Sequence, residues 1–312
     1  MDFKGAPLGT GSTFALAGAS AVVGRTLVAP YSVAKIFCQT GVPGGRTGAF
    51  QTYNFIWKSY GLPGFYRGNL TAALRLFPYA GIQFTVYDKL SRTFISRKGQ
   101  GTKNPSLESL VQIYLAGAIG GTVATLATHP LDVIKTRLTV QPQPLWYKGT
   151  VDAFGKIWAQ EGFSGLYRGL VPSVLGSATY SALLFLALDV SDNLPWRRRN
   201  TAPIFYYEWL TAPAMCVAAA YAVSHPFDVI RKKVMAQSFV LPKNGGVNVS
   251  FKGTIDCAWR IYQHQWFFGY YAGWFSNALK IFPQVIVFVV AVNGLRGFAE
   301  SSGVGVETKL GL

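Results

Sequence analysis

The chain has 312 residues, of which only 13% are charged and 50% are hydrophobic, a composition too apolar for an ordinary soluble protein. Its 29 Lys and Arg residues against 13 Asp and Glu residues give a net charge of +16, which favours anionic lipid and an anionic solute as partners. Without a basic helix or stripe this charge does not indicate nucleic acid, and three isolated cysteines indicate no disulfide framework.

Four stretches contain no Asp, Glu, Lys or Arg, and each is long enough to cross a bilayer as a helix. They are Gly5–Gly24, Ser109–Leu131, Gly169–Leu188 and Trp209–Phe227. The first ten residues resemble neither a secretory signal nor an Arg-rich transit peptide, so we expect any targeting information inside the mature sequence.

A pattern of proline, basic stretch, glycine, amphipathic segment and second glycine occurs three times, beginning at Pro30, Pro130 and Pro226. The two glycines are 20 residues apart in each copy: Gly48 and Gly68, Gly149 and Gly169, and Gly253 and Gly273. Fixed-period repetition indicates one structural unit built three times. We therefore predict a single domain over residues 1–312, with repeats at 10–100, 106–195 and 203–300.

Each copy is interpreted as a long apolar helix that ends near the proline motif, a short amphipathic helix and a second long helix. The long helices are predicted near residues 12–39, 70–94, 111–139, 170–191, 208–237 and 272–298. The predicted fold is an all-α membrane protein, with six transmembrane helices in a pseudo-threefold bundle around a central pathway. Three short amphipathic helices lie on one side of it.

The sequence after each proline carries a recognisable signature. Residues 130–135 are PLDVIK and residues 226–231 are PFDVIR, and residues 161–169 run from Glu-Gly to Tyr-Arg-Gly. This triplicated pattern resembles the mitochondrial carrier family over nearly the whole chain. Segments 75–84 and 165–176 are most similar to its coenzyme A and adenine nucleotide carriers.

The resemblance implies a solute carrier of the mitochondrial inner membrane, with the short helices on the matrix side. The expected activity is movement of an anionic nucleotide-like metabolite, preferably coenzyme A or an adenine nucleotide, by alternating access. No phosphate-binding loop, metal-ligand spacing or other catalytic constellation is present in the sequence, so we expect no enzyme and no metal. The alternative is a transport-inactive receptor or adaptor, favoured by Ser32 in place of an acid.

Three residues stand seven positions after the second glycines: Arg75, Gly176 and Lys280. The register of the copies predicts one common depth for them, and the resemblance makes them substrate contacts. Charged residues inside a membrane are costly and usually face a partner or a water-filled cavity. The predicted site is two cations for an anion and a glycine that leaves room for a flat ring. The alternative is that the two cations pair with buried acids.

Three further residues extend this predicted solute site. Ser177 follows Gly176, Arg25 stands five residues before the first motif proline, and Tyr180 lies one turn beyond Gly176. The resemblance makes Arg25 and Tyr180 substrate contacts, whereas an ordinary packing role for Tyr180 remains equally open.

The motif charges are predicted to form a matrix gate in which an acid of one copy pairs with the base of the next. The family arrangement implies the pairs Asp132–Arg231 and Asp228–Lys35, with Gln39 as a brace. The third base, Lys135, lacks its acid because position 32 is serine. A weaker cytosolic gate is predicted from Asp88, Asp189 and Arg296.

Aromatic-base-glycine segments and glycines that begin the short helices resemble the family's cardiolipin sites. The residues concerned are Arg67, Gly68, Gly149, Arg168, Gly169 and Gly253. Helix N-termini present free amides to anions, although simple glycine turns would explain the same pattern. We expect a monomer with cardiolipin as a structural lipid and no other cofactor.

Overall fold

The computed structural model describes residues 22–41, 48–95, 107–192, 206–237, 251–277 and 279–280, and the side chains of most of them. Within these ranges the regular structure is helical, without a strand. The elements are α2 (Ala29–Thr40), α3 (Ala49–Gly64), α4 (Asn69–Ile95), α5 (Leu107–Val140), α6 (Thr150–Leu166), α7 (Leu170–Asp192), α9 (Tyr206–Ala236), α10 (Thr254–Gln265) and the 3-10 helix η2 (Phe267–Tyr271).

The long helices α4, α5, α7 and α9 lie within a few residues of the ranges predicted from the repeats. The first predicted helix is described from residue 22, and its helical residues 22–27 are followed by a turn at Val28 before α2 begins. Of the sixth predicted helix, residues 272–273 form a turn and residues 274–277 and 279–280 are helical, whereas position 278 and the part beyond 280 lie outside the described residues. Three short helices, α3, α6 and α10, begin directly after Gly48, Gly149 and Gly253.

Among the described residues, one helix is both long and apolar enough to cross a membrane, namely Val111–Val140 within α5. A shorter apolar helix spans Leu170–Leu184 in α7. Helix α4 has sufficient length, but it carries Arg75 near its start and three further charged residues, at positions 88, 89 and 92.

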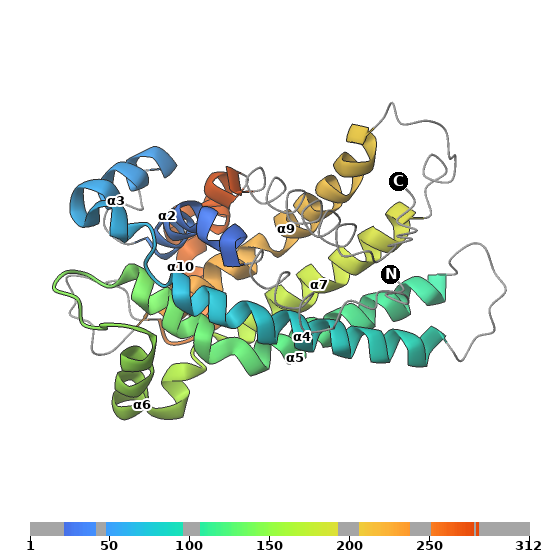
Figure 1. The fold of residues 1–312 in the computed structure, drawn as a ribbon, viewed down its shortest axis with the longest axis horizontal. Helices are drawn as coiled ribbons and strands as arrows, with labels where there is room; N and C mark the ends of the chain where they lie inside the picture. The colour runs from blue at the N-terminus through green and yellow to red at the C-terminus, as the bar shows by residue number, and fades with distance from the viewer. Residues whose placement is uncertain are drawn as a thin grey trace, which may run out of the picture.

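The helices assemble with their short members at one end. Figure 1 shows α4 and α5 side by side along the long axis, with α3, α6 and α10 near the end where α2 lies. Along the chain α4 packs on α5, α5 on α7 and α7 on α9, while α2 contacts both α5 and α9. This arrangement brings the ends of α2, α5 and α9, which carry the proline motifs, into contact with one another.

Each short helix packs on the long helix that precedes it. Phe37 of α2 lies in one buried cluster with Ile56 of α3. The next copy repeats the arrangement with Ile134 of α5 and Ile157 of α6. The third uses α9 and Ile261 of α10. The second and third clusters each lie within one copy, whereas the first also includes Val140 of α5 and Ala236 of α9. Full burial of a large apolar side chain stabilises the fold by about 1.5–3 kcal/mol, so these clusters hold the short helices in place.

The second glycine of each copy contacts the motif of the next copy. A Cβ added at Gly68 would lie 3.0 Å from the carbonyl oxygen of Lys135, and φ at Gly68 is +70°, so glycine alone fits there without strain. The same contact recurs, at 3.3 and 3.1 Å, from Gly169 to Arg231 and from Gly273 to Lys35. The copies therefore touch in the cyclic order first to second, second to third and third to first.

Candidate solute-binding site

A single buried carboxylate on α5 gathers cations from two other helices. Asp132 is 3% exposed in its side chain and lies 2.9 Å from the Nζ of Lys232 on α9. The guanidinium of Arg75 on α4 is 3.4 Å away, and that of Arg231 on α9 is 3.6 Å away. Three cations therefore share one acid, whose charge cannot neutralise all of them.

A second buried carboxylate lies on α9. Asp228 pairs with Lys35 of α2 at 2.6 Å, and Gln39 donates a hydrogen bond to it at 2.9 Å. Arg231, one turn further along α9, also donates through Nε to Asp228 at 2.6 Å. Lys35 donates a further hydrogen bond to Asn277 at 3.1 Å. This cluster links the first and third copies.

Further cations surround the two acids. Arg25 interacts electrostatically with Arg75 and Asp132, and Lys280 interacts with Arg25 and Asp228. Lys135 completes the set, 9% exposed and electrostatically coupled to Arg25 and Arg75. The cations are Arg25, Lys35, Arg75, Lys135, Arg231, Lys232 and Lys280.

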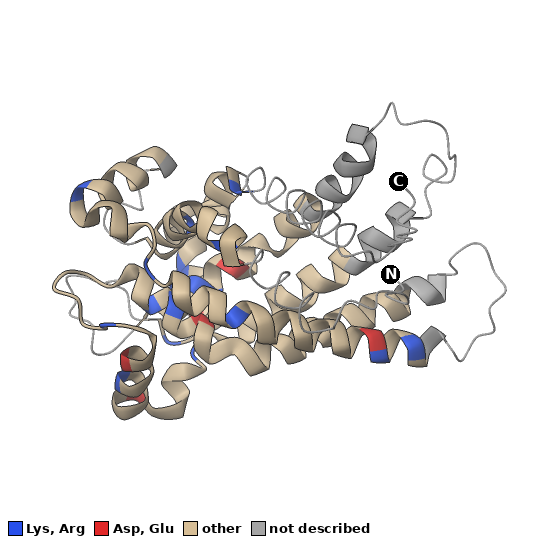
Figure 2. Cartoon of the chain, viewed as in Figure 1, with Lys and Arg blue, Asp and Glu red and all other residues tan. Residues whose placement is uncertain are grey.

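Counted by formal charge, seven basic side chains minus two carboxylates, Asp132 and Asp228, give an excess of +5. Figure 2 shows these charges gathered toward the end of the bundle where the motifs meet, whereas the middle of α5 and α7 carries none. An uncompensated buried cation is costly, because burial removes its hydration without supplying a partner. The cluster is therefore suited to bind an anion with several negative charges.

Aromatic rings line the same region. The rings of Tyr180 and Tyr221 meet edge to face at 5.1 Å, and the Nζ of Lys35 lies 5.0 Å from the centre of the Tyr221 ring. Arg75 lies over the ring of Tyr79 at 4.9 Å. These contacts are compatible with packing at Tyr180, and they also place cations and ring faces close together, as stacking of a base on an aromatic side chain would need.

The structure corrects the expected open space at Gly176. A Cβ added there would lie 3.1 Å from the Cβ of Phe227, so α9 fills the volume that the sequence analysis assigned to a flat ring. The hydroxyl of Ser177 donates to the carbonyl of Val174 at 3.1 Å, and its own carbonyl faces Gly121 of α5. Both residues serve close helix packing in this structure, and a contact with solute remains a prediction.

The predicted matrix-gate residues are largely brought together. Asp132 and Arg231 approach at 3.6 Å, and Asp228 pairs with Lys35. Lys232 was not among the predicted residues, although it forms the shortest contact to Asp132. The signal was an additional base directly after the motif arginine, at a position where the other copies have isoleucine and threonine.

Arg75 fits both alternatives raised for it, namely a cation for the solute and the partner of a buried acid. It belongs to the cation cluster expected for a solute, and it also contacts a buried acid, Asp132. Its side chain is 21% exposed, so the guanidinium keeps access to solvent. Its Nη1 contacts Asp132 at 3.4 Å and its Nε donates to the hydroxyl of Thr128 at 3.3 Å, which leaves the remaining guanidinium donors for an anion.

The residues of the predicted cytosolic gate are not assembled within the described part of the chain. Asp88 pairs with Arg92 on its own helix at 2.9 Å, and both are exposed. Asp189 lies in α7, but its side chain is outside the described residues, as is Arg296 altogether. This gate stays a prediction.

The bases of the predicted lipid sites form bonds inside the protein. Arg67 donates to the carbonyl of Gln141 at 2.8 Å, and Arg168 donates to that of Gln237 at 3.1 Å. Each arginine thus binds a carbonyl directly beyond the long helix of the next copy. Gly149 begins α6 in an extended conformation.

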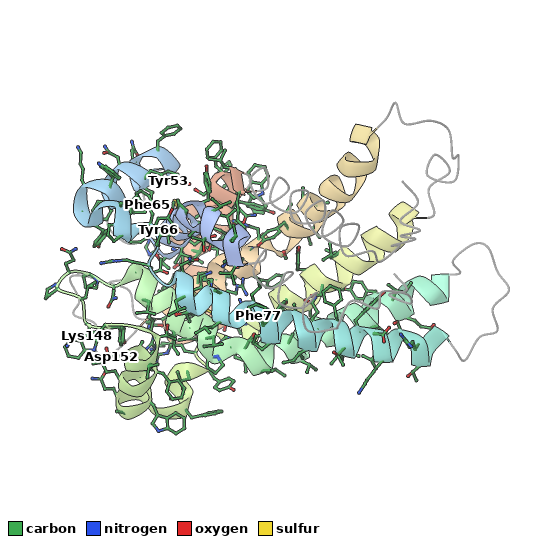
Figure 3. All side chains as sticks on the ribbon, viewed as in Figure 1. Tyr53, Phe65, Tyr66, Phe77, Lys148 and Asp152 are labelled. Atoms are coloured by element: carbon green, nitrogen blue, oxygen red, sulfur yellow. The ribbon has the colours of Figure 1, made fainter. Side chains whose placement is uncertain are left out.

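Acids stand at the starts of α6 and α10, near Gly149 and Gly253. Figure 3 shows Lys148 beside Asp152, whose carboxylate accepts a 2.9 Å hydrogen bond from the Lys148 amide. That bond and the Lys156 ammonium lower the pKa of Asp152. Asp256 accepts the equivalent bond from Lys252. A lipid phosphate would share these helix starts with a carboxylate.

Comparison with known sequences identifies the family. The sequence profile of the family "Mitochondrial carrier protein" matches three times, at residues 6–98, 106–198 and 203–302. Solute carrier family 25 member 43 of Mus musculus is 36% identical over 275 residues, which cover 86% of this chain and 76% of the mouse protein. The segment of residues 237–257, with its Leu-Pro, Gly-Gly-Val and Asp-Cys sequences, resembles that member.

Several relatives carry names that describe a solute, and two of them represent the two kinds of solute. Mitochondrial adenine nucleotide transporter ADNT1 of Arabidopsis thaliana is 30% identical over 289 residues, with 86% of this chain and 82% of the plant protein covered. Mitochondrial coenzyme A transporter SLC25A42 of Danio rerio is 33% identical over 223 residues, with 70% of this chain and 67% of the fish protein covered. With its triplicated motifs and three profile matches, the chain belongs to the mitochondrial carrier family.

Proposed function

We propose that the protein is a carrier of the mitochondrial inner membrane that moves an anionic nucleotide-like solute, coenzyme A or an adenine nucleotide, by alternating access. Its six long helices form a pseudo-threefold bundle in this proposal, with the short helices facing the matrix. The observation that carries it is the buried excess of cations around Asp132 and Asp228. A polyphosphate supplies the negative charge that this cluster lacks.

The residue types fit recognition of phosphate. Arg75 has a planar guanidinium that can bind two phosphate oxygens at once, whereas Lys280 acts as a point charge. Aromatic rings beside Arg75 and Lys35 are suited to a purine. The relatives named for adenine nucleotide and coenzyme A transport support this class of solute.

The contacts of Asp132 suggest how binding drives the cycle. Asp132 is shared by Arg75 of α4 and by Lys232 of α9. A solute phosphate that binds Arg75 competes with Asp132 for that guanidinium and weakens the link between α4 and α5. A ligand shifts a conformational equilibrium only through such differential contacts, so a state in which solute replaces carboxylate becomes favoured.

The proposal is tested with purified protein in liposomes that contain cardiolipin. Labelled ADP and coenzyme A are offered outside, with the same compounds or buffer inside, and uptake is followed with time. We expect uptake of at least one of them above that of protein-free liposomes. No uptake of either, by a protein that melts cooperatively, would contradict the proposed function.

Two departures from the sequence motifs favour a second candidate, a transport-inactive adaptor. Ser32 removes one acid of the gate, and Trp266 replaces a glycine of the third motif. An adaptor would bind no nucleotide, so a thermal-shift screen separates the two functions. Ligand at about 100 times its dissociation constant stabilises a protein by about 2.7 kcal/mol.

We further propose that the protein works as a monomer with cardiolipin bound near the starts of the short helices, and with no other cofactor. The glycine-initiated helices α6 and α10 and the neighbouring arginines support this site. Added cardiolipin should raise the melting temperature in detergent. An unchanged melting temperature would count against the assigned lipid residues.

A further inference from the structure

Lys135 is a buried base that forms no ion pair of its own among the described residues. Its side chain is 9% exposed, and among the described residues it makes no hydrogen bond and no ion pair. Its electrostatic neighbours are three basic groups, Arg25, Lys232 and Arg75, and one acid, Asp132, which other cations contact directly. Such a position is costly unless an anion arrives from outside the chain.

The missing partner can be identified from the cyclic contacts of the copies. Asp132 of the second copy meets Arg231 of the third, and Asp228 of the third meets Lys35 of the first. By the same rule, the acid position of the first copy, position 32, should meet the base of the second copy, Lys135. That position is Ser32, whose buried Oγ has no hydrogen-bond partner among the described residues.

Asp132 does not replace the missing acid. It stands three residues before Lys135 on α5, and its carboxylate is shared by Lys232, Arg75 and Arg231. Three residues of helix correspond to a rise of about 4.5 Å. Lys135 therefore lies about one turn from the carboxylate that Arg75 contacts, within reach of a second group on a solute bound at Arg75.

We infer that Lys135, with the hydroxyl of Ser32 as a hydrogen-bond donor, forms a second anion site for another phosphoryl group of the solute bound at Arg75. The inference rests on the proposed function and narrows it to solutes with at least two phosphoryl groups. Because position 32 is serine and not an acid, Lys135 is available to bind the solute. With an acid at position 32 it would form a gate ion pair.

The wild-type protein provides the first test, which needs no variant. Dissociation constants are measured in detergent for AMP, which has one phosphoryl group, and for ADP and adenosine 3′,5′-bisphosphate, which have two. We expect one of the two-phosphoryl compounds to bind about tenfold or more tightly than AMP, as one added charge-assisted hydrogen bond allows. Equal affinities for all three would overturn the inference while leaving a nucleotide carrier intact. No binding of any nucleotide would overturn the proposed function with it.

Two variants locate the effect. Ser32→Asp offers Lys135 a carboxylate, and Lys135→Gln removes the charge. In each variant the two-phosphoryl compound should bind about as tightly as AMP, while the affinity for AMP itself changes little. Ser164→Asp adds the same charge on the exposed face of α6 and should leave the preference unchanged. A preference that survives in folded Ser32→Asp or Lys135→Gln would show that Lys135 is not the second site.

Inorganic phosphate tests whether the Lys135 site binds a second group of the same solute or a separate free anion. Phosphate alone should stabilise the wild-type protein far less than ADP at equal concentration. If it stabilises as strongly as ADP, and does so only when Lys135 is present, the site binds a free anion and the inferred role in the solute is wrong.

Discussion

The corners where a long helix meets its short helix differ between the second and third copies, although their backbones agree. In the second copy Arg137 is fully buried and forms two hydrogen bonds with Glu161, at 2.7 and 2.8 Å. The equivalent residues of the third copy are Lys233 and Gln265. One corner is held by a bidentate ion pair, and the other has lost its acid.

The backbone after these residues makes the same unusual turn in both corners. Gly162 has φ +64° and ψ −158°, and Trp266 has φ 52° and ψ −154°. This conformation is almost restricted to glycine and costs other residues about 1–3 kcal/mol. The fold therefore imposes the turn on a residue that is poorly suited to it.

The first copy shows that the corner tolerates an entirely different chemistry. Phe37 and Tyr60 stand where the second copy has its ion pair, and their ring centres are 6.1 Å apart. Gly61 keeps the positive φ of the turn at +64°. Backbone geometry is thus the shared property of the three corners, whereas the side chains that fill them are exchangeable in kind.

The largest predicted effect comes from breaking the buried pair of the second corner. Arg137→Ala leaves Glu161 without its bidentate partner and also removes the bonds from Arg137 to the carbonyls of Met235 and Gln237. Loss of one partner of a buried pair typically costs about 3–5 kcal/mol. The melting temperature of the purified protein should fall by several degrees or more.

A double exchange provides the matched control for that variant. Arg137→Phe with Glu161→Tyr transfers the aromatic corner of the first copy to the second. It should recover part of the lost stability, because both members of the buried pair are removed together, while Arg168, which lies 3.8 Å from Glu161, is 21% exposed and keeps its bond to the carbonyl of Gln237. A double variant as unstable as Arg137→Ala would show that the corners are not interchangeable.

The helices and the three copies could be predicted from the sequence because apolar runs and glycine spacing are local properties. The site could be predicted only in part. Arg75 and Lys280 follow from repeat register, but the contact of Lys232 with Asp132 depends on how two helices, 100 residues apart, approach. The filled space beside Gly176 was likewise invisible, because a sequence does not show which side chain of a neighbouring helix faces a glycine.

A gain in stability is predicted at the third corner. Trp266→Gly relieves the strained φ while removing a side chain that is 66% exposed. The entropy of glycine in the unfolded chain offsets about 0.5–1 kcal/mol of the relief, so we expect a net stabilisation of about 1 kcal/mol. Thermal unfolding should show a higher melting temperature, and Gly162→Ala in the second copy should show a lower one. A lower melting temperature for Trp266→Gly would mean that the ring itself stabilises the corner.

The smallest predicted effects are at the starts of α6 and α10, where the two copies agree. Asp152 and Asp256 have lowered pKa values because backbone amides donate to them. Their contributions are therefore present above the usual pKa of aspartate and are lost as the pH falls through the lowered values. Asp152→Asn and Asp256→Asn should each reduce the melting temperature slightly at neutral pH, and less at acidic pH. Clearly unequal shifts would show that the two helix starts differ after all.

Uptake of nucleotide by Arg75 variants tests most directly the claim that the buried cation excess binds the solute. In cardiolipin-containing liposomes Arg75→Ala should abolish uptake of ADP or coenzyme A, whichever the wild type transports. Arg75→Lys should remain impaired, because an ammonium cannot bind two oxygens as a guanidinium does. Arg260 of α10 is paired with Asp256, and its side chain is 38% exposed. Arg260→Ala is the matched control and should transport normally. Normal uptake by folded Arg75→Ala would contradict the account.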